Sequence, residues 1–285
     1  SKVETELRQL IAIGDNGSGL RSTPASFPLA QLNQTELDSL LPDDKPVDDI
    51  YPLTPLQQGM LFHSLLDNSS DVYLASFNWL LEGRLDVSLF EKAWNLIINQ
   101  HSSLRSATQW QGIKTPVQVV YDNVSVPFDV EDWTNFEPLE QEARLAKWFN
   151  ADRNKRFDLA SAPLTRVTLL QMGDTTYRMI WSFHHMIMDG WSVPLVIREV
   201  FSAYEALAKD QTPKLIETRP FSDYISWLLA QDQTAAQEYW RKSMQGFTAP
   251  TRLPGADLSD AAQNAAPDYE EVHFGLPPPA GKSLK

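Results

Sequence analysis

The spacing of hydrophobic residues changes at one point in the middle of the chain, from a continuous run to a helical repeat. Residues 177–183 are mostly apolar or aromatic, as in a buried strand. Beyond an Asp-Gly pair at 189–190, apolar side chains recur at helical spacing at Val193, Val196, Ile197, Val200, Phe201, Tyr204 and Leu207. Ser192 is a suitable N-cap for this helix, and Pro194 fits its first turn. The pattern therefore predicts a strand, a turn and a helix.

The same criteria predict strands and helices across most of the chain. Thr54 is expected to cap a helix that has Pro55 in its first turn, and Asp86 to open another that reaches Ile98. Further strands are expected at 72–81, 104–110, 116–121 and 163–171, and further helices at 137–149, 221–231 and 234–244. The two central strands of this list are predicted to form a hairpin, which would make the sheet mixed. The expected fold class is therefore α/β, with a mixed sheet packed against helices.

Proline and short polar residues gather toward both ends of the chain. Residues 1–48 are interpreted as a linker that holds a short amphipathic helix at 1–14. Prolines also dominate residues 250–285, in which 270–276 is expected to form one short strand. The folded domain is therefore expected to occupy residues 49–249.

Composition and charge exclude several classes of site. The 285 residues are 42% hydrophobic and include nine Trp and thirteen Phe, enough for a substantial core. A formal net charge of −13 argues against nucleic acid or an anionic membrane as the main partner. The absence of cysteine excludes disulfides, thiolate metal sites and a cysteine nucleophile. The N-terminus lacks the apolar core of a signal peptide and there is no run of 18 apolar residues, so a cytoplasmic protein is expected.

His184 and His185 follow the predicted strand directly, at a junction where polar side chains can face a cleft. Imidazole exchanges a proton near neutral pH, so such a histidine is a candidate general base or hydrogen-bond partner of an attacking amine or alcohol. Position alone does not choose between these roles. His63, His101 and His273, which stand alone in the sequence, are interpreted as surface or satisfied core residues.

Residues 184–190 read HHMIMDG and match the HHxxxDG motif of the condensation domains of nonribosomal peptide synthetases. Three other segments agree with this resemblance. TPLQQGMLF at 54–62 is similar to the family's opening motif, QHSSLRS at 100–106 to its RHxxLR(T/S) motif with Gln in the first place, and FSDYISW at 221–227 to its YxDYAxW helix. Four motifs in family order make the resemblance specific.

The resemblance implies a chloramphenicol-acetyltransferase-like fold of two similar lobes, with the active site in the tunnel between them. It covers residues 49–285, and the family's later motifs do not occur in the chain. Residues 49–249 are therefore expected to be the N-terminal lobe, and 250–285 the Pro-rich connection and the start of the second lobe. The rest of the second lobe is expected to be missing from this chain, and residues 1–48 to be the interdomain linker from an upstream domain.

Carried onto this sequence, the resemblance implies that His185 lies at the tunnel centre, where it orients or deprotonates the acceptor amine as it attacks the donor thioester. Gly190 is expected where the backbone bends sharply or approaches the substrate. His184 is expected to be structural, and Asp189 to hold the loop through an ion pair with Arg105.

Several neighbouring side chains are expected to serve packing rather than chemistry. Trp181 and Trp191 flank the end of the strand and are interpreted as core residues. Gln57, Met60 and Phe62 are interpreted as mostly core, with the exposed end of their helix able to line the tunnel.

The implied function is peptide-bond formation between a donor acyl or peptidyl thioester and an acceptor aminoacyl amine. Both substrates would be carried on phosphopantetheine arms of upstream and downstream peptidyl carrier domains, with no directly bound cofactor or metal. The alternatives are an epimerization domain, which shares HHxxxDG but has a different opening motif, and a free coenzyme A acyltransferase; a cyclization domain, with aspartates in place of the histidines, is disfavoured. The isolated lobe is expected to be inactive, or to act as a non-catalytic docking fragment for carrier domains.

Overall fold

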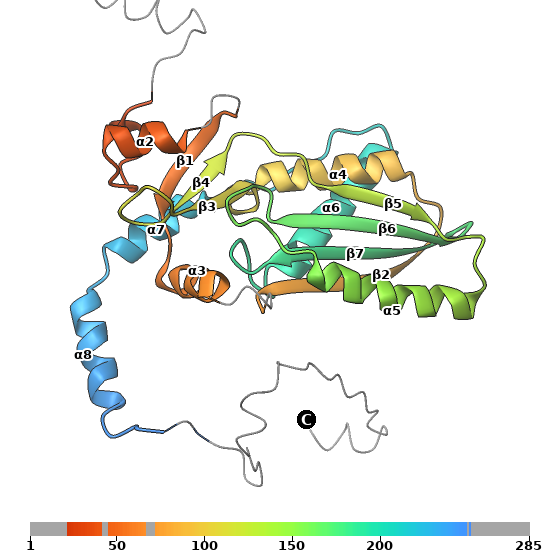
Figure 1. Cartoon of the computed structure of the whole chain (residues 1–285). Helices are drawn as coiled ribbons and strands as arrows, with labels where there is room; N and C mark the ends of the chain where they lie inside the picture. Colours follow the sequence, from red (N-terminus) through yellow and green to blue (C-terminus); the bar gives the residue numbers. More distant parts are fainter. Residues whose placement is uncertain (1–21, 42–44, 67–71, 250, 252–285) are drawn as a thin grey trace, which may run out of the picture. The chain divides into compact units, whose positions relative to one another are not determined.

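A computed structural model describes residues 22–41, 45–66, 72–249 and 251 (Figure 1). The chain divides into two compact units, residues 1–231 and 232–285, and each is described by itself. The helix expected at 1–14 and the strand expected at 270–276 lie outside the described residues.

The larger unit contains a four-stranded sheet in the order β2-β7-β6-β5. These strands are β2 (Leu74–Glu82), β5 (Phe128–Asp132), β6 (Thr165–Gly173) and β7 (Thr176–His184). β7 is antiparallel to both β2 and β6, whereas β5 is parallel to β6, which confirms the mixed sheet. Sequence analysis missed β5, because its five residues are mostly exposed and carry three acidic side chains.

Both faces of this sheet are covered by helices, because β7 sends buried side chains to each side. Met179, Trp181 and Phe183 pack into the cluster that also holds residues of α4 (Val87–Gln100) and α6 (Val193–Ala208). Ile180 instead packs with residues of α5 (Pro138–Asn154). A strand buried on both faces reads as a continuous apolar run, which is the pattern seen at 177–183.

A second sheet lies beside the first and is fully antiparallel, in the order β1-β4-β3. Its strands are β1 (Val47–Pro52), β3 (Ser106–Gln109) and β4 (Val117–Tyr121). The pairing of β3 with β4 confirms the predicted hairpin. The hairpin does not belong to the mixed sheet, however, so the prediction that it makes that sheet mixed was wrong.

Three of the remaining helices match the predictions within a few residues. They are α3 (Pro55–Leu66), α7 (Phe221–Leu229) and, in the smaller unit, α8 (Gln233–Ser243). The described residues also contain α2 (Gln34–Leu40) and the short 3-10 helices η1 (Pro24–Ser26) and η2 (Ser102–Arg105). The predicted cap at Asp86 is confirmed, since its carboxylate Oδ1 accepts from Leu89 N at 3.1 Å. Thr54 Oγ1 likewise accepts from Gln57 N at 3.2 Å.

Residues 22–41 and 47–48, within the segment interpreted as an interdomain linker, are packed into the larger unit. Phe27, Ala30, Leu32 and Leu37 are buried in one apolar cluster with side chains of β1 and β4. Val47 and Asp48 lie in β1, which pairs with β4. Pro24 begins η1. Because several prolines gather in this segment, its composition resembled that of a linker.

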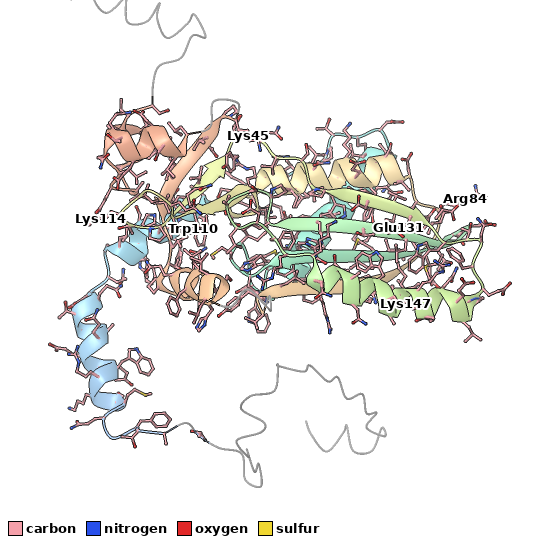
Figure 2. The ribbon with its side chains drawn as sticks, in the orientation of Figure 1. Lys45, Arg84, Trp110, Lys114, Glu131 and Lys147 are labelled. Atoms are coloured by element: carbon pink, nitrogen blue, oxygen red, sulfur yellow. The ribbon has the colours of Figure 1, made fainter. Side chains whose placement is uncertain are left out.

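Charged side chains lie on the surface of the larger unit (Figure 2). Lys45 and Lys114 are exposed near the three-stranded sheet, Arg84 follows β2 and Lys147 lies on α5. None of the described helices is long and apolar enough to span a bilayer.

Candidate functional site

The turn between β7 and α6 is held by its own polar side chains. Asp189 Oδ1 accepts from Ser192 N at 3.0 Å and from the Ser192 hydroxyl at 2.9 Å. Ser192 occupies the N-cap position of α6, but its side chain does not cap the helix, because the hydroxyl donates back to Asp189. Pro194 lies in the first turn, as predicted. Asp189 therefore closes the turn that follows the histidines.

The two histidines at the start of this turn take opposite hydrogen-bonding roles at Nδ1. Met186 N donates to Nδ1 of the buried His184 at 3.0 Å, so the neutral His184 ring carries its proton on Nε2. His185 Nδ1 lies 3.2 Å from Met188 O, and because a carbonyl oxygen only accepts, His185 donates from Nδ1. The neutral His185 ring therefore carries its lone pair on Nε2.

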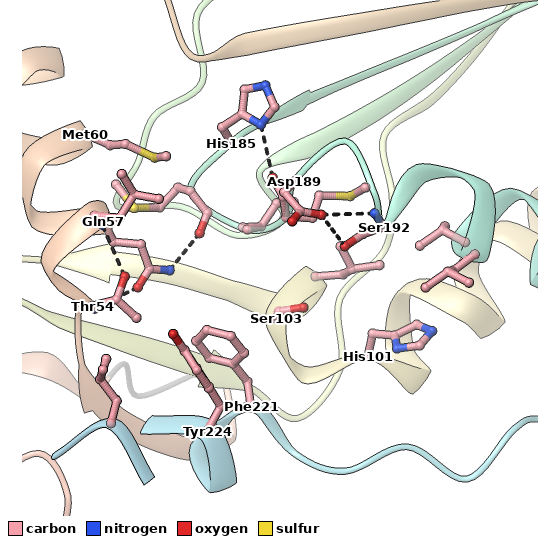
Figure 3. Close-up of a pocket in the computed structure, with 18 of the residues that line it drawn as sticks. Thr54, Gln57, Met60, His101, Ser103, His185, Asp189, Ser192, Phe221 and Tyr224 are labelled. Carbon is pink, nitrogen blue, oxygen red and sulfur yellow. Dashed lines mark hydrogen bonds between the residues drawn. The ribbon is translucent and has the colours of Figure 1, made fainter. Parts of the chain in front are cut away.

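A pocket of about 640 Å³ opens beside His185 (Figure 3). It is lined by α3 and its cap, by the region of η2, by the turn after β7 with the start of α6, and by α7. Its apolar lining comes from Pro55, Leu56, Met60, Leu104, Met186, Ile187, Met188, Leu195, Val196, Phe221 and Leu228. Polar lining comes from Thr54, Gln57, His101, Ser103, His185, Asp189, Ser192 and Tyr224. The four segments that carry the family motifs thus meet at one pocket.

His101 lines the pocket as a satisfied, partly buried residue. Its Nε2 lies 2.7 Å from Glu199 Oε2, which joins the end of α4 to α6. This fits the interpretation of His101 as a satisfied residue, although the interpretation did not place it at the site.

Arg105 does not pair with Asp189, and this prediction was wrong. Its Nη2 donates to Asp48 Oδ2 at 3.0 Å, and its Nη1 donates to the carbonyls of Tyr121 and Asp122. The buried guanidinium therefore joins η2 to the start of β1 and to the end of β4. Asp189 is exposed and has local partners instead, so neither charge depends on the other.

Trp191 also differs from expectation, whereas the expected approach of Gly190 to the substrate stays a prediction. A Cβ placed on Gly190 would meet nothing within 4 Å, so the fold itself does not require glycine there. Trp181 is fully buried, as predicted, but Trp191 is 87% exposed, so the prediction of a core residue was wrong for it. The side chain of Phe62 is likewise 60% exposed rather than core.

Gln57 is the residue whose importance sequence analysis missed. Its side chain is buried, and its Nε2 donates to Met186 O at 2.8 Å, which reaches the turn that carries His185. Its Oε1 accepts from Thr54 N at 2.9 Å, completing a capping box with Thr54. The Thr-x-x-Gln spacing at 54–57 was a usable signal for that local bond, but the bond to Met186 has no local signal.

Two ionisable groups of β1 have shifted pKa values. Burial raises the pKa of Tyr51, whose ring lies 5.9 Å from that of Phe221. Desolvation also raises the pKa of Asp49, partly offset by hydrogen bonds from the Ser222 side chain and from Ile50 N. Across the described residues, no three His, Asp or Glu side chains gather in a way that could hold a metal ion.

Comparison with known proteins assigns the family. The model of the condensation domain matches residues 47–283. The chain belongs to the condensation-domain family. The condensation domain is similar to bacitracin synthase 3 of Bacillus licheniformis, at 31% identity over 285 residues, covering 100% of this chain and 4% of that protein. It is also similar to tyrocidine synthase 2 of Brevibacillus parabrevis, at 35% identity over 215 residues, covering 75% of this chain and 6% of that protein.

Solved structures show that the fold is that of condensation domains, which is the chloramphenicol-acetyltransferase-like fold. The starter condensation domain of the rhizomide synthetase RzmA matches with a TM-score of 0.63 at 22% identity, covering 71% of this chain and 50% of that one. The first condensation domain of the CDA synthetase matches with a TM-score of 0.62 at 20% identity, with the same coverage of 71% and 50%. The chain thus spans about half of these domains and a few per cent of the synthetases.

Proposed function

We propose that this condensation domain forms an amide bond between a donor acyl or peptidyl thioester and an acceptor aminoacyl amine, each carried on the phosphopantetheine arm of a carrier domain. The observation that carries the proposal is the orientation of the His185 ring at the pocket. Because Nδ1 donates to Met188 O, Nε2 is the nitrogen that can accept a proton.

In the proposed reaction, the amine nitrogen attacks the thioester carbonyl carbon, the C–N bond forms and the C–S bond breaks. His185 Nε2 accepts a proton from the attacking amine, and that proton then passes to the departing thiolate of the donor arm. A thioester is already activated, so alignment of the two tethered substrates supplies much of the rate and the proton acceptor adds to it. His184 serves by holding Met186 N, and no step requires its ring to exchange a proton.

The lining of the pocket supports an uncharged substrate end. None of its lining residues is Lys or Arg, and more than half of them are apolar. Such a surface suits an acyl or aminoacyl thioester better than the phosphate of the arm, which is bound through cations or backbone amides. We propose that the rest of the condensation domain, beyond the half that this chain matches, closes the other side of the pocket.

The test is the His185→Ala variant of the intact synthetase, with His63→Ala as control. His63 is an exposed histidine of α3 and does not line the pocket. Product formation by the His185 variant is expected to fall about 10²–10⁴-fold, while its melting temperature stays close to that of the parent. Unchanged turnover would overturn the role of His185. An inverted aminoacyl thioester without amide product would show epimerization instead.

A second assay addresses residues 1–285 alone. With one side of the pocket open, this chain is expected to fold but to form no amide between two carrier-bound substrates. Measurable amide formation by these residues would show that one half of the domain is enough, whereas carrier binding without turnover would fit a docking role for this half.

A further inference from the structure

We propose that Gln57 is a positioning residue for the reaction: its buried side-chain amide holds the carbonyl of Met186, the residue after His185, and so sets the direction of the imidazole. This inference rests on the proposed function for its catalytic meaning. Its structural part concerns only the contacts of Gln57 and can be tested separately.

The backbone of Met186, the residue after His185, is held at both its N–H and its carbonyl. Met186 N donates to His184 Nδ1 at 3.0 Å, and Met186 O accepts from Gln57 Nε2 at 2.8 Å. On the other side of His185, its own N donates to Tyr73 O at 2.9 Å. The backbone around His185 is therefore held by three bonds, of which the one from Gln57 comes from α3 and is drawn in Figure 3.

The orientation of the Gln57 amide follows from its backbone partners. Thr54 N can only donate, so the atom facing it is Oε1, and Met186 O can only accept, so the atom facing it is Nε2. The same Oε1 also accepts from Gln118 Nε2 at 3.1 Å. The amide is therefore fixed in one rotamer by three bonds, which gives the turn a rigid support.

Gln118 extends this support into the three-stranded sheet. It lies in β4, is 1% exposed, and its Oε1 accepts from the Ser106 hydroxyl at 3.3 Å. Ser106 lies in β3, so the bonds run from β3 through β4 and α3 to the turn after β7. We call Gln57 and Gln118 the amide relay. It ties the histidine turn, which belongs to one sheet, to the core of the other.

The relay consists of neutral groups, which matters beside a proton acceptor. A buried carboxylate or ammonium at the position of Gln57 would act on His185 through a poorly screening interior and change its proton affinity. An amide positions the turn without that electrostatic effect. Replacing Gln57 should therefore change the geometry of the turn, and the reaction rate should change as a consequence.

The structural test uses residues 1–285 and measures hydrogen-exchange protection of single amides. In Gln57→Met, which keeps the length of the side chain but loses the amide, protection of Met186 N and Ile187 N is expected to fall about tenfold relative to Val119 N and Leu169 N. The latter two report on the cores of the two sheets. Gln58→Met is the matched control, because Gln58 is the exposed neighbour on α3 and its Nε2 bonds to Leu53 O.

The isosteric variant Gln57→Glu adds a pH signature. A deprotonated carboxylate can accept from Thr54 N and Gln118 Nε2 but cannot donate to Met186 O, whereas the neutral acid can do both. Burial raises the pKa of such a carboxyl, so protection at Met186 N is expected to return toward the parent value between about pH 8 and about pH 6. If Gln57→Met does not fold, this variant carries the same test. If the side chain at position 57 only filled space, the protection of Met186 N would not recover at lower pH.

The catalytic test is made in the intact synthetase. Gln57→Met is expected to lower kcat for amide formation about tenfold while KM for each carrier substrate stays within about twofold. Equal protection at Met186 N in Gln57→Met and Gln58→Met, or equal losses at all four amides, would overturn the positioning role. Selective loss of protection with full activity in both Gln57→Met and His185→Ala would leave the structural part standing and overturn the proposed function instead.

Discussion

Two groups of buried polar side chains brace the four-stranded sheet, and they differ in charge. The amide relay supports the turn at the end of β7 with neutral bonds. On the face covered by α5, Asp152 accepts from Arg166 Nε at 2.8 Å and from the Ser182 hydroxyl at 2.8 Å, and Ser182 is bonded to Ser76. We call these four residues the α5 cluster. An ion pair therefore joins α5 to the sheet, whereas neutral amides support the turn beside the pocket.

The difference suggests that the α5 cluster contributes mainly to stability and the amide relay mainly to the geometry of the histidine turn. A buried ion pair is strongly directional but costly to break, because the remaining charge is left without a partner. Both Asp152 and Arg166 are 6% exposed, and the Arg166 guanidinium also lies 4.4 Å from the Phe157 ring. Substitutions in the α5 cluster should therefore reduce stability, whereas substitutions in the amide relay should reduce turnover more than stability.

The largest effect is expected from Asp152→Ala. The variant leaves Arg166 buried without its counter-ion, so the free energy of unfolding should fall by about 3–5 kcal/mol. Urea unfolding of residues 1–285 measures this, with Asp174→Ala as an exposed control in the turn between β6 and β7. The double variant Asp152→Leu with Arg166→Met should lose less than Asp152→Ala alone, because it buries no unpaired charge. If the double variant lost as much stability as Asp152→Leu and Arg166→Met lose together when measured singly, the two residues would not be a coupled pair.

A smaller loss is expected at Arg105, and it separates the observed partner from the predicted one. Arg105→Met removes donors to two backbone carbonyls and to Asp48, and should lower the free energy of unfolding by about 1–3 kcal/mol. Asp48→Asn should cost less than about 1 kcal/mol, because the Asp48 side chain is 48% exposed. In double-mutant cycles measured by urea unfolding, Arg105 should couple to Asp48 and not to Asp189. Coupling to Asp189 alone would support the pairing predicted from the sequence instead.

Asp49→Asn should stabilise the protein, with an effect that depends on pH. Because desolvation raises the pKa of Asp49 in the folded state, folding favours its protonated form. The wild-type contribution is therefore complete below the unfolded pKa of about 3.9 and is lost as the pH rises through the folded value. The variant should be more stable than wild type at pH 7, with the difference vanishing toward pH 3. Thermal melts at both pH values check this, and a constant difference would contradict it.

The smallest change in stability is expected from Gly190→Ala, within about 0.5 kcal/mol, because the added Cβ meets no atom of the fold. Gly59→Ala, inside α3 and equally open, is the control and should stabilise the helix by about 0.5–1 kcal/mol. Thermal unfolding measures both variants. If Gly190→Ala nevertheless lowers turnover in the intact synthetase, the need for glycine comes from the substrate; a loss of stability would place it in the fold.

Local signals in the sequence predicted most elements of the fold. The caps at Thr54 and Asp86 act within three residues of themselves, so spacing reveals them. The double-faced burial of β7 follows from its continuous apolar run. By contrast, the core role of Phe27 and Leu37 depends on contacts with β1 and β4, and the surrounding prolines concealed it.

At the candidate site, the motif located the histidines but not their supports. The partner of Arg105 lies 57 residues earlier in the chain, and a charge count cannot choose between Asp48 and Asp189. The exposure of Trp191 is equally invisible to periodicity, because it falls within a turn. What the sequence could not supply was the set of bonds between distant segments, and the amide relay consists mainly of these.

The order of synthesis gives the Gln57 amide its partners one at a time. Thr54 precedes it by three residues, Gln118 follows 61 residues later, and Met186 follows 129 residues later. At roughly 5–20 residues per second, translation of those 129 residues takes roughly 6–26 s. During that interval the helix can keep the amide bonded to Thr54; Gln118 is made about halfway through, and Met186 is made last. On the ribosome, the bond from Gln57 to Met186, in the turn that carries His185, is therefore the last of the three bonds that can form.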